Sequence, residues 1–89
     1  MSAGMDGGGT RDEVRQFVKA VAVYLRPDQE LRDDDDLLAL GAIDSLGFVE
    51  LVDEVQSRYG ISVEDLDINE DNFGSVTAIT RYVEQRRAR

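Results

Sequence analysis

The 89-residue sequence contains no histidine and no cysteine, and these two absences exclude much of the chemistry that small proteins perform. Without histidine the chain lacks the commonest general base, and without cysteine it has neither a thiolate nucleophile nor a disulfide. The same absences remove the nitrogen and sulfur ligands of most zinc sites. Only hydroxyl and carboxylate groups remain, so the composition argues against an enzyme and favours a module that binds or carries.

Long hydrophobic runs and an excess of positive charge are also missing. No apolar run approaches the roughly 18 residues of a membrane-spanning helix, and residues 1–9 lack the basic start and apolar stretch of a signal peptide. Ten Lys and Arg face 19 Asp and Glu, for a net charge of −9, which repels phosphate backbones and anionic membranes. We therefore expect a cytoplasmic protein that binds no nucleic acid and no membrane and meets partner proteins through their basic patches.

Glycine is concentrated at the start of the chain, in the tail of residues 1–9. Because such a composition gains too little by burial to offset the entropy of ordering, we predict a disordered tail over 1–9 and a folded domain over 10–89. Thr10 and Glu13 form a Thr-x-x-Glu capping box, and the apolar stripe that follows predicts a helix over 11–25 that Pro27 ends. The stripe comprises Val14, Phe17, Val18, Val21, Tyr24 and Leu25.

Two acid-rich segments raise the question of a metal site. The four aspartates 33–36 precede Leu37, Leu38 and Leu40, a pattern typical of a solvated loop over 28–41 that is pinned at its end. Asp65, Asp67, Asn69 and Asp71 alternate like the first ligands of an EF-hand loop. However, Glu70 replaces the required glycine and Val76 replaces the bidentate glutamate, so we predict no dedicated metal site.

A second helix is predicted over 45–59, where Asp44 suits the N-cap and Gly60 suits the position after the end. At about 100° per residue its apolar face comprises Phe48, Val49, Leu51, Val52, Val55 and Tyr59. The opposite face gathers Glu50, Asp53, Glu54 and Ser57. Leu46 falls on this acidic side, so we expect its side chain to be available to a partner.

The rest of the chain is also helical. A short helical turn is expected within 64–73, and Ser75 caps a last amphipathic helix over 76–87. Amphipathic helices that have no sheet to pack on must bury their apolar stripes against each other. The sequence therefore predicts an all-α fold, a small four-helix bundle with three main helices and one short helix.

The segment 40–51 carries the candidate site. Ser45 would occupy the first turn of the second helix, with its hydroxyl directed away from the packed stripe. A helix N-terminus stabilises an anion, so a phosphate on Ser45 would be tolerated, although the carboxylate of Asp44 opposes it slightly. Gly47 lowers helix propensity by about 0.8–1 kcal/mol relative to alanine, and it either loosens this turn or allows a close approach.

Asp44-Ser45-Leu46, placed after Leu-Gly and before an amphipathic helix, resembles the attachment motif of acyl and peptidyl carrier proteins. The layout of about 80 of the 89 residues follows the same family, including Tyr-Gly-Ile at 59–61 and Asn-Phe-Gly-Ser-Val at 72–76. This resemblance implies a bundle of acyl-carrier type, with 10–89 as the carrier domain. It also implies that a phosphopantetheinyl transferase attaches 4′-phosphopantetheine from coenzyme A to Ser45, whose added thiol then carries an intermediate as a thioester.

The resemblance further implies a stand-alone, monomeric carrier without catalytic residues of its own. Its other partners would be an acyl- or aminoacyl-loading enzyme, an acyltransferase or a synthase. The residues suited to partner recognition are Asp44, Leu46, Glu50, Asp53 and Glu54. Fatty acyl, polyketide, aminoacyl and hydroxyacyl cargo all stay open, and the segment 66–68 either lines an acyl tunnel or packs in the core. The alternative function is an acidic helical adaptor that docks a basic protein and carries nothing.

Overall fold

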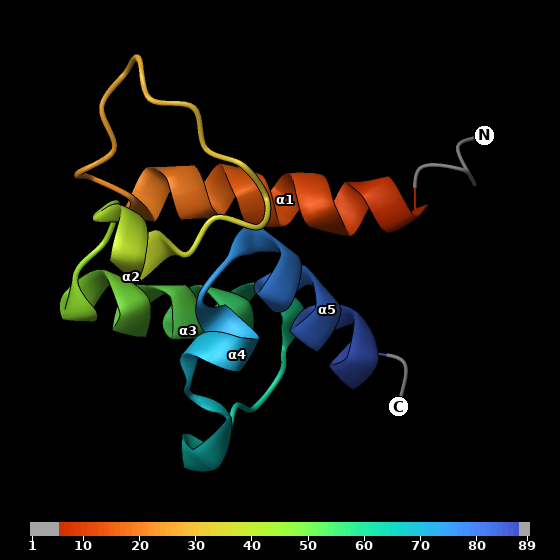
Figure 1. Cartoon of the computed structure of the whole chain (residues 1–89). Coiled ribbons are helices and arrows are strands. Elements are labelled where there is room, and N and C mark those ends of the chain that lie inside the picture. The colour runs from red at the N-terminus through yellow and green to blue at the C-terminus, as the bar shows by residue number, and fades with distance from the viewer. Residues whose placement is uncertain (1–5, 88–89) are drawn as a thin grey trace.

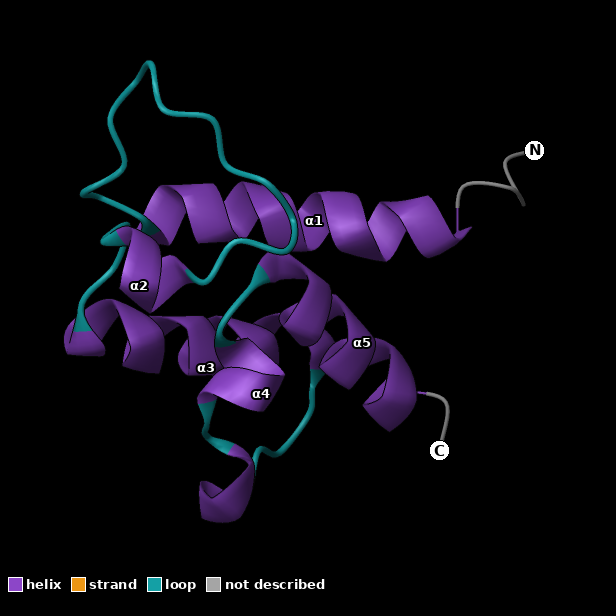
Figure 2. Ribbon diagram, in the orientation of Figure 1, coloured by secondary structure: helices purple, strands orange, loops and turns teal. Residues whose placement is uncertain are grey.

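The computed structural model describes residues 6–87, with side chains described from residue 9, and these residues form helices and loops without a strand (Figure 2). The three long helices are α1 (Asp6–Val21), α3 (Ser45–Tyr59) and α5 (Val76–Arg87). Short helices are α2 (Leu37–Leu40), α4 (Glu70–Phe73) and a 3-10 turn, η2 (Asp65–Asp67). The predicted all-α fold with three main helices is confirmed, and α2 is a short helix that the sequence had not indicated.

The first helix has different bounds from the predicted 11–25, because α1 begins at Asp6 and ends at Val21. Glycine lowers helix propensity but does not forbid a helix, so the glycines of residues 7–9 extend the first turns and Thr10 lies inside the helix. Residues 1–5 of the expected tail lie outside the described residues. At its other end α1 stops well before Pro27: the Val23 N–H already turns to the carbonyl of Val21 at 2.8 Å, and the Tyr24 N–H then donates to the carbonyl of Ala42 at 3.3 Å.

The core lies where the apolar stripes of the long helices meet. In Figure 1, α1 lies across the top of the bundle, and both α3 and α5 pack against it, while α4 packs on α5 and α3. The Phe73 ring is at the centre of an aromatic group, 5.0 Å from the ring of Tyr82 and 6.5 Å from that of Phe48 between centroids. The largest fully buried side chains are Phe17, Phe73, Leu37, Leu51, Ile79, Val14, Val18, Val55, Val76 and Val83.

The acidic segment after α1 is a long loop, as predicted, but it is tied to the bundle rather than free in solvent. The Asp33 carboxylate accepts hydrogen bonds from Arg11 at 2.6 Å and from Arg15 at 2.8 Å. Its main-chain carbonyl accepts the N–H of Thr77 at 3.0 Å, which joins the loop to the start of α5. The Arg11 hydrogen bond holds the pKa of the Asp33 carboxyl below its usual value.

The predicted loop 28–41 ends in the single helical turn α2. Asp36 caps this turn by accepting two backbone N–H groups, and Gly41 ends it in the left-handed conformation at φ 79°. Leu37 is fully buried, and its N–H donates to the carbonyl of Gly74 at 2.8 Å. The turn therefore holds the chain against the end of α4 just before the candidate site begins.

The second and last predicted helices agree with the structure. α3 has the predicted bounds, 45–59, and Gly60 follows it in the left-handed conformation at φ 63°. α5 has the predicted bounds, 76–87, and the Ser75 hydroxyl accepts the N–H of Ala78 at 3.0 Å. One residue of the predicted buried face is misplaced, since Val49 is 52% exposed. It lies at the edge of the apolar arc, where no neighbouring helix covers it.

Candidate functional site

Ser45 is the first residue of α3, and its side chain is exposed. The segment before it is fixed, because the Ala42 N–H donates to the Leu37 carbonyl at 3.0 Å and the side chains of Ala42 and Ile43 are buried. Two anchored apolar residues therefore bring the chain to the surface at Asp44. The serine hydroxyl lies at the positive end of a 15-residue helix, on a rigid support and open to a large partner.

Asp44 is the predicted N-cap of α3, with extended backbone angles of φ −109° and ψ −169°. Its Oδ1 accepts the Gly47 N–H at 3.0 Å, and its Oδ2 accepts the hydroxyl of Tyr24 at 3.2 Å. The hydrogen bond from the Gly47 N–H, helped by that from Tyr24, holds the pKa of the Asp44 carboxyl below its usual value. The carboxylate beside Ser45 is therefore ionised at neutral pH and bonded through both oxygens.

Gly47 is buried because the first turn of α3 lies directly on its neighbours. A Cβ at this position would lie 2.9 Å from the Cβ of Ile43 and 3.5 Å from Cγ1 of Val21. Of the two roles left open for this glycine, the structure supports close approach. The position of Ser45 relative to α1 therefore depends on Gly47, because any larger residue there would contact Ile43 and Val21.

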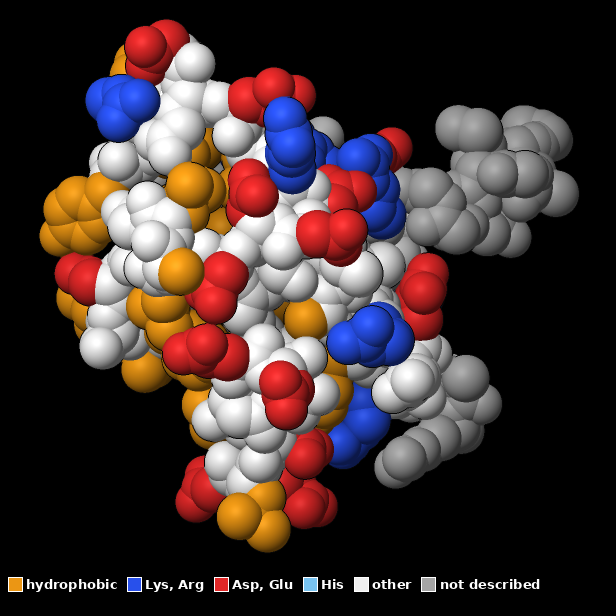
Figure 3. Space-filling view, viewed as in Figure 1, with side chains coloured by type: hydrophobic (Ala, Val, Ile, Leu, Met, Phe, Trp, Pro, Cys, Tyr) orange, Lys and Arg blue, Asp and Glu red, His pale blue; other side chains and the backbone are white. Residues whose placement is uncertain are grey.

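Exposed apolar side chains surround the N-terminal end of α3. Leu46 is 68% exposed, as predicted, and the turn after α1 adds Val23 at 74% and Tyr24 at 59%. Figure 3 shows hydrophobic side chains gathered on its left side, over the start of the long loop, α2 and the first turns of α3. We call these exposed side chains, Val23, Tyr24, Leu40 and Leu46, the apolar collar.

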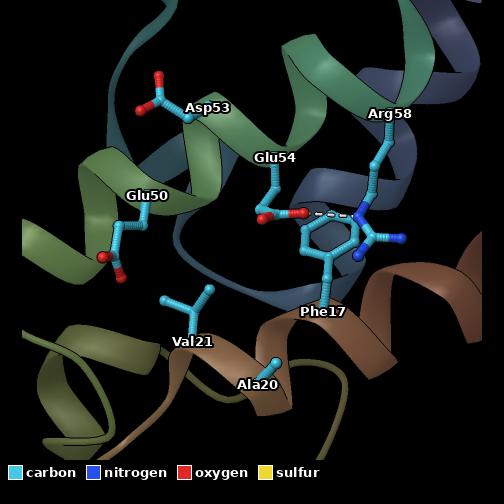
Figure 4. A pocket seen from close by; sticks show the side chains of 7 residues that line it. All are labelled: Phe17, Ala20, Val21, Glu50, Asp53, Glu54 and Arg58. Atoms are coloured by element: carbon cyan, nitrogen blue, oxygen red, sulfur yellow. Dashed lines mark hydrogen bonds and ion pairs between the residues drawn. The ribbon is translucent and has the colours of Figure 1, made fainter.

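The predicted acidic residues line a groove of about 380 Å³ between α1 and α3 (Figure 4). α1 contributes its apolar side, with Phe17, Ala20 and Val21. α3 contributes Glu50, Asp53, Glu54 and Arg58. We call this feature the acidic groove.

Within the acidic groove, the guanidinium of Arg58 lies between the Glu54 carboxylate and the Phe17 ring. Its Nε donates to the Glu54 carboxylate at 2.6 Å, and its guanidinium carbon lies 5.2 Å from the centroid of the Phe17 ring. Glu50 and Asp53 make no ion pair within residues 9–87. In Figure 4 the Glu50 side chain points from α3 toward α1, whereas the carboxylate of Asp53 points away from α1. The predicted recognition residues thus fall into two places: Asp44 and Leu46 beside Ser45, and three carboxylates along the groove.

Sequence reasoning missed three contributors to this surface. Tyr24 was assigned to the buried stripe of the first helix, and its contact with Asp44 joins positions 20 residues apart. Val21 was likewise assigned to that stripe and not to a groove. Arg58 was not singled out, although it stands four residues after Glu54, the spacing at which helical side chains meet. That spacing is the one local signal that could have placed Arg58 in the groove.

Two side chains of the second acid-rich segment are bonded within the fold. The Asp67 carboxylate accepts the hydroxyl of Tyr82 at 2.9 Å and pairs with Arg86 at 3.3 Å, and Asn69 caps α4. Leu66, immediately before Asp67, is 89% exposed, so it lines no interior tunnel. Across the described side chains no group of three or more carboxylates has the arrangement of a metal site.

No helix within residues 6–87 is both long and apolar enough to span a membrane. On the face drawn in Figure 3, acidic side chains are scattered among Lys, Arg and hydrophobic side chains.

Comparison with known proteins adds two findings. The sequence model of a family described as "phosphopantetheine attachment site" matches residues 15–83, which include the whole of the site. The D-alanyl carrier proteins of Streptococcus pyogenes serotype M5 (strain Manfredo), serotype M49 (strain NZ131) and serotype M1 are each 40% identical to this chain over 52 residues. The match covers 58% of this chain and 66% of each relative, just under two thirds of their length.

Proposed function

Because the chain belongs to the family of phosphopantetheine attachment site domains, whose prosthetic group is 4′-phosphopantetheine, we propose that it carries this group on Ser45 and presents an intermediate as a thioester to partner enzymes. As a member of a carrier family it is not itself a catalyst. The observation that carries the assignment of Ser45 is its position: an exposed hydroxyl on the first residue of α3, within the matched segment.

The surroundings of Ser45 fit a phosphodiester. The free backbone N–H groups and the dipole of α3 favour a negative charge at this end of the helix. The nearest carboxylate, that of Asp44, is bonded to Gly47 and Tyr24. When bound, the group supplies the thiol that this cysteine-free chain lacks.

The experiment that tests this function is intact-protein mass spectrometry after incubation with coenzyme A, Mg²⁺ and a broad-specificity phosphopantetheinyl transferase. We expect the wild-type chain and Ser57→Ala to gain one phosphopantetheine and Ser45→Ala to gain none. Ser57 is a matched control because it is an exposed serine on the same helix. If folded, unmodified wild-type protein gains no mass, the acidic adaptor is the better account.

We further propose that partner enzymes recognise the apolar collar and the acidic groove, through Asp44, Leu46, Glu50, Asp53 and Glu54. The collar supplies an apolar contact and the groove a negative rim, a combination suited to brief docking. The way Arg58 lies on Phe17 and Glu54 indicates that a partner's arginine suits the remaining length of the groove, next to Glu50 and Asp53.

Charge reversal separates this recognition from modification of the serine itself. With the same transferase, Glu50→Lys and Asp53→Lys should raise KM for the carrier and leave kcat nearly unchanged, and the increase should shrink at high salt. Glu84→Lys on α5 is the control, an exposed acid on a helix that does not line the groove. Equal KM values for all three variants would contradict the assignment of the groove.

The similarity to D-alanyl carrier proteins supports an aminoacyl cargo, and we propose this class over a fatty acyl chain. The exposure of Leu66 agrees, because a long acyl chain gains most from an interior tunnel that this residue does not line. The phosphopantetheinylated protein should gain one aminoacyl residue from an enzyme that adenylates D-alanine, with ATP. Loading by a fatty-acyl ligase and not by this enzyme would contradict the proposal. A cytoplasmic location and a monomeric state, both expected from the sequence, complete it.

A further inference from the structure

Tyr24 is hydrogen-bonded to Ala42 and to Asp44, two residues of the segment that leads into α3. Its backbone N–H donates to the carbonyl of Ala42 at 3.3 Å, and its hydroxyl donates to Oδ2 of Asp44 at 3.2 Å. The ring between these two groups stays 59% exposed, so burial of the ring does not explain its position. The turn that ends α1 is therefore attached to the segment that leads into Ser45.

The Tyr24 hydroxyl completes the set of hydrogen bonds on the Asp44 carboxylate. Oδ1 caps α3 by accepting the N–H of Gly47. Without the Tyr24 hydroxyl, Oδ2 would have solvent or the hydroxyl of Ser45 as its hydrogen-bond partner. Within residues 9–87 the Ser45 hydroxyl makes no hydrogen bond with Asp44. The carboxylate is thus occupied on both oxygens while the adjacent hydroxyl is left available.

This arrangement resolves an electrostatic conflict at the site. Attachment forms a bond between Ser45 Oγ and the β-phosphorus of coenzyme A and breaks its pyrophosphate bond. Adenosine 3′,5′-bisphosphate leaves, and the serine proton passes to a base of the transferase. A carboxylate one residue away opposes this step twice, since it can accept the serine proton in a competing hydrogen bond and it repels the incoming phosphate.

We propose that Tyr24 is a positioning residue for the modification of Ser45, because its hydroxyl keeps the Asp44 carboxylate in the capping position and away from both the serine hydroxyl and the phosphate. This inference rests on the proposed attachment at Ser45. It assigns to Tyr24 an effect on the chemical step, carried through Asp44, rather than a contact with the reacting atoms.

The test compares two tyrosines that each donate to a carboxylate. Tyr24→Phe removes the hydroxyl beside the site, and Tyr59→Phe removes a hydroxyl that donates to Glu13 at 2.9 Å on another part of the bundle. A hydrogen bond of this kind contributes about 0.5–1 kcal/mol, so we expect kcat for the transferase to fall about two- to fivefold in Tyr24→Phe. KM for the carrier should stay nearly the same, because phenylalanine keeps the exposed ring of the apolar collar. Tyr59→Phe should match the wild type in both constants.

A double-mutant cycle with Asp44→Asn identifies the route of the effect. The amide still caps α3 but carries no charge, so Tyr24→Phe should no longer change kcat in this background. An effect of the same size in both backgrounds would show that Tyr24 acts by another route and would overturn the proposal. Unchanged kcat in the single variant would do the same.

A spectroscopic measurement on the loaded carrier does not depend on transferase kinetics. The ³¹P chemical shift of the phosphodiester should move in Tyr24→Phe and stay in place in Tyr59→Phe, because only the first variant releases a carboxylate beside it. Identical shifts in all three proteins would count against the proposal. Failure of the proposed function is a separate result, in which the wild-type chain takes up no phosphopantetheine.

Discussion

Replacement of Gly47 by alanine measures how tightly the first turn of α3 is set against the rest of the molecule. The added Cβ would lie 2.9 Å from Cβ and 3.3 Å from Cγ2 of Ile43, and 3.5 Å from Cγ1 of Val21. Because every residue except glycine has a Cβ, a different side chain at position 43 cannot remove the closest contact. The backbone of α3 or of Ile43 must move instead.

Two opposing effects set the size of the change. Alanine in place of glycine within a helix gains about 1 kcal/mol, whereas overpacking of a well-filled core loses about 1–3 kcal/mol. The net expectation is that Gly47→Ala lowers the free energy of unfolding by up to about 2 kcal/mol. Gly9→Ala is the matched control, since Gly9 lies in α1 and a Cβ added there would meet nothing within 4 Å, so this variant should be neutral or stabilising.

Urea denaturation followed by circular dichroism gives both values, and the rate of phosphopantetheine transfer gives a second measure for Gly47→Ala. We expect the transfer rate to fall, because the backbone movement that accommodates the added Cβ occurs two residues from Ser45. The reasoning is refuted if Gly47→Ala is stabilised as much as Gly9→Ala, since the space beside the glycine would then be larger than the structure indicates.

Three further predictions concern single groups. Burial and the hydrogen bond to Glu13 raise the pKa of Tyr59 to about 12. The stability that the neutral phenol contributes is therefore complete below pH 10 and is lost as pH rises toward 12. Ultraviolet titration should show a midpoint near the raised pKa, and Glu13→Gln should lower that midpoint. The Thr80 hydroxyl is buried in α5 without a partner in the described residues, so Thr80→Val should raise the free energy of unfolding by about 1 kcal/mol, and a loss of stability in urea would show that the hydroxyl is bonded. The lowered pKa of Asp33 means that its contribution is present above pH 4 and is lost at lower pH, so acid unfolding of Asp33→Asn should be less steep below about pH 4 than that of the wild type.

The parts of the fold that the sequence predicted are those with a local cause. The bounds of α3 follow from an aspartate cap at one end and a glycine with positive φ at the other, and both signals lie within a residue of the helix. Ser75 marks the start of α5 for the same reason. Leu46 could be assigned to the surface because its angle on the helix does not depend on the neighbouring elements.

The features that sequence reasoning missed have distant causes. The turn after α1 is held by a hydrogen bond from Tyr24 to Ala42, a contact between positions that no pattern along the chain connects. The turn α2 is four residues long, too short for a periodic signal, and it is supported by a hydrogen bond from Leu37 to Gly74. The role of Gly47 needed the neighbouring side chains, since propensity alone predicts only a weaker helix.

The packing of α1 against α5 has a consequence for how the protein is made. Among the described residues these are the first and last helices, and the loop between α1 and α2 is also bonded to Thr77 at the start of α5. While the ribosome is still adding residues 76–87, much of the apolar stripe of α1 has no surface to cover it. The nascent chain therefore cannot reach its final form piece by piece, and we expect it to fold as one cooperative unit only after α5 has been released.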